Sequence, residues 1–138
     1  MAGGSGLIER FYREVMEGGN IDLVDELGSE NYTEHEEPMP GQPSGLEGIK
    51  FYVNTFRSAF PDIKAKTIEP TIVDGDLEAA RVVLSGTHKG DLMGTAPTGS
   101  PVEFSGIDII RVRDGKVAEH WGATDMLKLL QQIGAVQM

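Results

Sequence analysis

The last part of the chain constrains the fold most, because it joins a long β-type run to a tight-turn signal. Pro101–Arg113 is rich in Val, Ile and Phe, and Asp114-Gly115 after it is a strong hairpin dipeptide. Val117–Trp121 is typical of the return strand, and Thr124 is a suitable cap for a short helix after it. This part therefore predicts a β-hairpin followed by a helix.

The chain before this hairpin predicts helices first and strands later. Apolar residues at helical spacing indicate helices over Leu7–Met16 and Ile21–Leu27, and a capping box at Ser44 opens a third helix, which Pro61 ends. From Ile63 the apolar period becomes that of strands, with a second hairpin signal at residues 74–76. This order predicts an α+β fold, in which helices and a curved antiparallel sheet form a cone with an apolar pocket at its open end.

Composition limits the classes of function. The chain has 138 residues, which suits one domain, and its net charge of −10 argues against nucleic acids and anionic membranes as partners. It has no cysteine and no apolar run long enough for a membrane span, which fits a cytoplasmic protein. We expect residues 1–6 to be a flexible leader and residues 7–138 to form the single domain.

Two aspartates in the C-terminal part are candidate functional groups. Asp108 lies in a strand between Ile107 and Ile109, and it is either solvated or placed on its own, mostly apolar face. Asp125 follows Trp121 at the junction of strand and helix, where an acid also suits the start of a helix.

Three other polar side chains are candidates. Tyr12 lies on the apolar stripe of the first helix, either as a core residue or as a donor into a cavity. His35 stands among glutamates, either in a solvated loop or pointing inward. His88 lies where a strand meets the loop over residues 89–100.

Several linked motifs resemble the SnoaL-like polyketide cyclases of the NTF2-like superfamily. The segments that carry the resemblance are GTHKG (86–90), APTG (96–99), GIDIIRVRDG (106–115), EHWGATD (119–125) and LLQQIG (129–134). The resemblance implies an α+β cone, homo-oligomers formed through the outer sheet face, and an intramolecular aldol condensation without cofactor or metal. It also implies that Asp125 is the general acid/base, supported by either His35 or His88.

Ketosteroid isomerase offers a more distant resemblance. Tyr12, His35 and Asp108 fall where that enzyme has a tyrosine, an acidic base and an aspartate, so His35 replaces a carboxylate. This resemblance implies a mechanism in which a base removes a proton next to a carbonyl and hydrogen-bond donors hold the enolate oxygen.

The leading hypothesis is thus a cofactor-independent cyclase or isomerase acting on an apolar, carbonyl-bearing small molecule. His35 or Asp125 moves the proton, while Tyr12 and a protonated Asp108 donate to the oxyanion. If so, the polar groups of Tyr12, His35, Asp108 and Asp125 converge on one cavity. Residues expected to contact the substrate are Trp121, Phe56, Phe60, Met93, Phe104 and Arg81.

Two alternatives remain open. The first is a non-catalytic module that only binds a small molecule. The second is an epoxide hydrolase of the same fold, in which Arg81 with Asp108 and Asp125 activates water, provided that Arg81 and Asp108 face the same cavity. A metal site is not expected, because the three histidines show no close ligand spacing and alternation turns His120 away from Trp121.

Overall fold

The computed structural model describes residues 4–137 and has helices first and the sheet after them. The helices are α1 (Leu7–Arg10), the π-helical segment η1 (Phe11–Glu17), α2 (Leu23–Leu27), α3 (Gly45–Ala59) and α4 (Met126–Gln132). The strands are β1 (Gly28–Glu34), β2 (Lys64–Asp74), β3 (Leu77–Thr87), β4 (Pro101–Arg113) and β5 (Lys116–Thr124).

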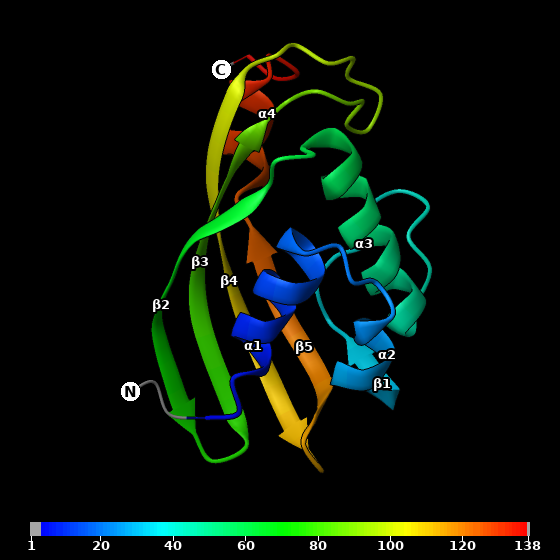
Figure 1. Cartoon of the computed structure of the whole chain (residues 1–138), viewed down its shortest axis with the longest axis vertical. Helices are drawn as coiled ribbons and strands as arrows, with labels where there is room; N and C mark the ends of the chain where they lie inside the picture. The colour runs from blue at the N-terminus through cyan, green and yellow to red at the C-terminus, as the bar shows by residue number, and fades with distance from the viewer. Residues whose placement is uncertain (1–3, 138) are drawn as a thin grey trace.

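The five strands form one curved sheet in the order β1-β5-β4-β3-β2. All neighbours pair antiparallel except β1 and β5, which run parallel. Figure 1 shows α1, α2 and α3 on one face of this sheet and α4 at the end where the chain terminates. The predicted α+β fold is therefore confirmed. None of the described helices is long and apolar enough to cross a membrane.

Alternation along β4 decides which side chains face the helices. Phe104 and Ile110 are buried on the inner face, whereas Ile107 and Ile109 are 47% and 37% exposed on the outer face. Because successive side chains in a strand point to opposite faces, Asp108 lies on the inner face with Phe104 and Ile110. This placement agrees with the interpretation that Asp108 lies on the mostly apolar face of its strand, and not with a solvated position.

Packed side chains fill the narrow end of the cone. Its fully buried side chains come from α3, β4, α4 and the loop after β3, and they include Phe56, Phe60, Phe104, Leu92, Leu129 and His88. The rings of Phe56, Phe60 and Phe104 lie 6.0–6.3 Å apart. Phe56, Phe60 and Phe104 thus fill the core, and the prediction that they line the pocket is wrong.

The structure differs from the sequence expectation at the start of α4 and in the leader. Asp125, and not Thr124, caps α4, since its carboxylate accepts the Lys128 N–H at 3.1 Å. Ser5, placed by the sequence in the flexible leader, donates from its N–H and its hydroxyl to Glu78 at 2.9 Å; residues 1–3 of that leader lie outside the described part.

Candidate active site

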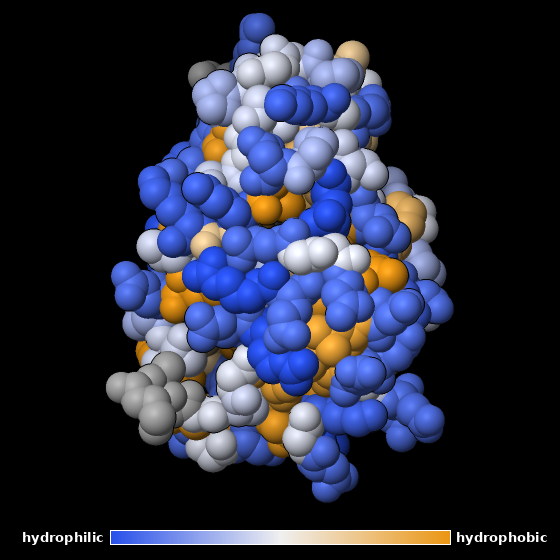
Figure 2. Space-filling model, viewed as in Figure 1, coloured by the Kyte–Doolittle hydropathy of each residue, from blue (hydrophilic) through white to orange (hydrophobic). Residues whose placement is uncertain are grey.

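A cavity of about 100 Å³ opens at the wide end of the cone, between the helices and the inner face of β4 and β5. Its walls are mostly apolar, with Leu7, Ile8, Val24, Leu27 and Ile49 among the lining residues. Figure 2 shows apolar surface exposed on this face of the molecule among the surrounding polar side chains. Such a cavity with a few convergent polar groups is typical of a small-molecule site. Its polar lining includes Tyr12, Tyr32, Glu34, Glu36, Asp108 and His120.

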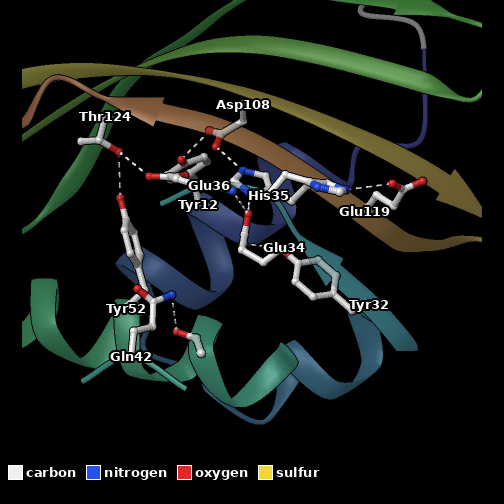
Figure 3. Close-up of polar contacts among 12 residues, drawn as sticks. Tyr12, Tyr32, Glu34, His35, Glu36, Gln42, Tyr52, Asp108, Glu119 and Thr124 are labelled. Carbon is white, nitrogen blue, oxygen red and sulfur yellow. Dashed lines mark hydrogen bonds and ion pairs between the residues drawn. The ribbon is translucent and has the colours of Figure 1, made fainter. Parts of the chain in front are cut away.

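Five of these side chains form one hydrogen-bonded chain across the cavity (Figure 3). The Tyr12 hydroxyl donates to Asp108 Oδ2 at 2.6 Å, and His120 Nε2 lies 2.7 Å from Asp108 Oδ1. On its other side, His120 Nδ1 lies 2.5 Å from Glu34 Oε2, and the Tyr32 hydroxyl donates to Glu34 Oε1 at 2.6 Å. The imidazole ring is therefore held between two carboxylates that come from two different strands.

The two carboxylates determine the charge of the ring. Burial opposes a charged ring, but the hydrogen bonds and charges of Asp108 and Glu34 outweigh it and raise the pKa of His120 to about 10. Burial also acts against the charge of Glu34, yet the bonds from His120 and Tyr32 lower the pKa of Glu34 below its ordinary value. At neutral pH, His120 is an imidazolium and Glu34 is a carboxylate.

Glu36 is a second acidic group in the cavity with a different environment. Its Oε2 accepts one long hydrogen bond of 3.4 Å from the Thr124 hydroxyl, which in turn lies 3.1 Å from the Tyr52 hydroxyl. Burial raises the pKa of Glu36, and the charges of Asp108 and Glu34 act in the same direction, while His120 opposes them. Glu36 is thus a stronger base than an ordinary glutamate.

Gly122 makes room for this carboxylate beside the ring. A Cβ atom on Gly122 would lie 2.5 Å from Glu36 Oε1 and 2.7 Å from His120 Cε1, closer than real Cβ contacts come. Gly122 is the direct partner of Asp108 in the β4–β5 pairing, so Glu36, His120 and Asp108 meet at one point of the sheet. The absence of a side chain at this position allows the three groups to approach one another.

One oxygen or nitrogen each from Glu34, Glu36 and His120 lies within 4.8 Å of the others, which is the spacing that a metal ion needs. Both nitrogens of His120, however, point at carboxylate oxygens, and the raised pKa of the ring keeps both of them protonated at neutral pH. Neither ring nitrogen therefore offers a free lone pair to a metal ion.

The structure brings together two of the four groups that were expected to converge. Tyr12 and Asp108 both line the cavity, as expected. We expected Asp108 to donate to an oxyanion, but in the structure it accepts from Tyr12 and faces the charged ring of His120. It is therefore an acceptor in the resting site.

His35 does not point into the cavity, so that prediction is wrong. Its N–H bonds to the His120 carbonyl, which continues the β1–β5 pairing, and alternation then turns Glu34 and Glu36 inward and His35 outward. On the outer face its ring stacks on Trp121 at 4.8 Å, and its Nε2 lies 3.0 Å from Glu119. Trp121 is therefore also on the outer face and does not line the cavity.

The remaining candidates also lie away from the cavity. Asp125 is exposed and caps α4, and His88 is fully buried in the narrow end, where its Nδ1 accepts the Thr98 N–H at 3.2 Å. Met93 is 44% exposed in the loop after β3. Arg81 is exposed and paired with Ile107 on the outer face, so it cannot act with Asp108 as the epoxide-hydrolase alternative requires.

His120, Glu34 and Glu36 are the functional candidates that sequence reasoning missed. The Asp114-Gly115 turn alone could not have placed His120, because the pairing of β4 with β5 shifts by one residue between Val112 and Arg111. For Glu34 and Glu36, alternation about His35 would have predicted the correct face if His35 had been placed outward.

Comparison with known proteins agrees with the fold. The sequence profile of the SnoaL-like polyketide cyclases matches residues 6–133. The chain belongs to this family. This SnoaL-like protein is 27% identical to aklanonic acid methyl ester cyclase AcmA from Streptomyces galilaeus over 126 residues, which are 88% of this chain and 87% of AcmA.

Two further relatives support the assignment. Nogalonic acid methyl ester cyclase from Streptomyces nogalater is 29% identical over 117 residues, which are 84% of this chain and 87% of that cyclase. The crystal structure of IdmH from Streptomyces antibioticus is similar with a TM-score of 0.80 at 32% identity, over 94% of this chain and 97% of IdmH. The similarity to these relatives thus extends over 84–94% of this chain.

Proposed function

We propose that this SnoaL-like protein is a cofactor-independent cyclase that closes a ring in a polyketide-like ester by an intramolecular aldol reaction. The observation that carries the proposal is the cavity in which a basic carboxylate, Glu36, faces an imidazolium, His120. An aldol closure needs one group that removes a proton and one that supplies a proton. The family and the names of its relatives support the substrate class.

Glu36 takes the proton from the carbon next to the substrate carbonyl. Its Oε2 accepts the single long bond from Thr124, so the carboxylate can turn toward a ligand. Its raised pKa makes it a better proton acceptor than an ordinary glutamate, and the apolar walls favour its neutral form after the transfer. The resulting carbanion attacks the second carbonyl and forms the new carbon–carbon bond.

The chain of Tyr12, Asp108 and His120 returns a proton to the alkoxide. The Tyr12 hydroxyl gives its proton to the alkoxide, His120 gives its Nε2 proton to the Asp108 carboxylate, and Asp108 passes a proton on to Tyr12. This transfer leaves the His120 ring neutral, with its Nδ1–H still bonded to Glu34. The substrate loses one C–H proton and gains one O–H proton, and exchange with solvent returns the proton from Glu36 to His120.

Replacing Glu36 with glutamine should lower kcat by about 100-fold or more, because the amide cannot accept the proton. The substrates in the assay are aklanonic acid methyl ester and nogalonic acid methyl ester. Liquid chromatography separates the cyclised product from the substrate, and mass spectrometry shows that its mass is the same as that of the substrate. The matched control is Glu30→Gln, which removes one exposed charge from the same strand β1 and should leave kcat unchanged.

The pH profile of wild-type kcat provides a second readout for the same variant. The rate should rise as Glu36 loses its proton and fall as the pH passes about 10, where His120 loses its own. The rising limb should be absent in Glu36→Gln. Tight binding of either ester without any product would contradict the cyclase and favour a binding module.

The outer face of the sheet supports a second proposal, which is that two copies of the chain associate there. Ile107 and Ile109 are exposed beside the ring of Trp121, which pairs with Ile109 across the strands. Light scattering on the eluted protein should give twice the mass of one chain, and Ile109→Glu should reduce it to that of one chain. A wild-type protein with the mass of a single chain would contradict the association.

A further inference from the structure

Each nitrogen of the His120 ring faces a different carboxylate, and this geometry requires two ring protons. A neutral imidazole has one N–H and one bare nitrogen, and a bare nitrogen repels a carboxylate oxygen. Asp108 lies 2.7 Å from Nε2 and therefore requires a proton there. Glu34 lies 2.5 Å from Nδ1 and requires the second. If Glu34 were absent, a neutral ring with its one proton on Nε2 would be enough to make the hydrogen bond to Asp108.

Three contacts hold Glu34 in place as an acceptor. The β1–β5 pairing makes Glu34 the direct strand partner of His120. The Tyr32 hydroxyl donates to Oε1 at 2.6 Å, and the Glu36 N–H donates to Oε2 at 3.1 Å. Burial raises the pKa of Tyr32, so its hydroxyl keeps the proton that it donates. Glu34 therefore stays charged and aimed at Nδ1.

We propose that Glu34 is the positioning residue that keeps His120 doubly protonated and so supplies the proton that the site passes to its substrate. The consequence for turnover rests on the proposed cyclase, whereas the charge of the ring does not. A neutral ring with Nε2–H would have to become an imidazolate in order to give that proton to Asp108. The site without Glu34 therefore keeps Asp108 and Tyr12 but loses the proton source behind them.

Other groups around the ring limit the size of the effect. The titratable side chains that face His120 come from η1, β1, the loop after β1, α3 and β4, and they are Tyr12, Tyr32, Glu34, Glu36, Tyr52 and Asp108. Asp108 keeps its own bond to Nε2 when Glu34 is removed. We therefore expect a partial shift of the ring titration rather than a return to the ordinary value.

The test is a histidine ring titration by NMR on protein labelled with nitrogen-15. The chain has three histidines, so the His120 signals are assigned by their loss in His120→Gln. Wild-type His120 should titrate near pH 10, and Glu34→Gln should lower that midpoint by about 1–3 pH units. Glu34→Asp keeps the charge on a shorter side chain and should give an intermediate midpoint.

Glu119→Gln is the matched control. Glu119 also bonds a histidine nitrogen, since its Oε2 lies 3.0 Å from His35 Nε2, but on the outer face of the sheet. This variant should leave the His120 midpoint unchanged. An unchanged His120 midpoint in both Glu34→Gln and Glu34→Asp would overturn the proposal.

Turnover provides the second readout. In Glu34→Gln, the alkaline limb of kcat should move to lower pH by the same amount as the ring midpoint. A shifted ring midpoint with an unmoved alkaline limb would overturn the role of Glu34 as the source of the substrate proton. A shifted midpoint in a protein whose wild type cyclises neither ester would support the ring charge and contradict the cyclase instead.

Discussion

Replacing His120 with leucine should lower the free energy of unfolding by about 3–5 kcal/mol at pH 7 and remove detectable turnover. The imidazolium is paired with both Asp108 and Glu34, whose side chains are only 14% and 16% exposed. Leucine fills similar space but leaves both carboxylates without the ring, and an unpaired charge in a partly buried site is costly. Urea unfolding followed by circular dichroism measures the change.

His35→Leu is the control for this comparison. His35 also bonds one carboxylate, Glu119, but its side chain is 37% exposed on the outer face. Exposed pairs of this kind contribute little, so this variant should change the free energy of unfolding by less than about 1 kcal/mol. Equal losses in the two variants would contradict the role of His120 at the centre of the cavity.

The contact between His120 and Glu34 makes the free energy of unfolding depend on pH. The folded protein holds the His120 proton up to about pH 10, whereas the unfolded chain releases it near 6.5. This contribution is complete below pH 6.5 and is lost as the pH rises through 10. Glu34 contributes at the acidic end instead, because folding lowers its pKa. Its contribution to the free energy of unfolding is lost as the pH falls below the ordinary pKa of a glutamate. In His120→Leu, the alkaline decline due to this ring should be absent.

Local pattern was enough to predict the fold and to name Tyr12 and Asp108 as candidates. Alternation along β4 separates the exposed Ile107 and Ile109 from the inner face, and so it places Asp108 inside. Tyr12 followed in the same way from the apolar stripe of the first helix, since it is buried with Val15 and Met16. Both inferences need only the period of a single element.

His120 was missed because its position depends on a β-bulge. The pairing runs from Val112 with Val117 directly to Arg111 with Glu119, so one residue of β5 is left over at Ala118. A regular hairpin from the same turn would pair Ile109 with His120 and turn the ring outward. The extra residue reverses the two faces, which brings His120 inside and sends Trp121 outside.

The walls of the pocket were mispredicted for a different reason. Helical spacing shows that Phe56 and Phe60 lie on the buried side of α3, but it does not show at which end of the cone the core is filled. These rings pack with Phe104 and His88 in the narrow end, while the cavity lies beside the other end of α3 and is lined by Leu46, Ile49 and Tyr52. That division depends on how all the elements pack together.

Asp108→Asn should lower kcat by about 1,000-fold, the second of the two largest effects that we expect. The amide keeps the size of the side chain, but it cannot carry a proton from His120 to Tyr12. An intact fold is expected, because the amide oxygen still accepts one of the two bonds and the amide nitrogen can approach a neutral ring.

The measurement that tests the central claim most directly is kcat for Asp108→Asn beside Asp125→Asn, with either methyl ester as substrate. Both variants make the same chemical change, but Asp108 lines the cavity, whereas Asp125 is exposed and caps α4. Asparagine is also a good helix cap, so Asp125→Asn should keep the fold and stay within a few-fold of wild-type kcat. The account predicts a loss confined to Asp108→Asn. A loss confined to Asp125→Asn would contradict it and move the proton chemistry out of this cavity.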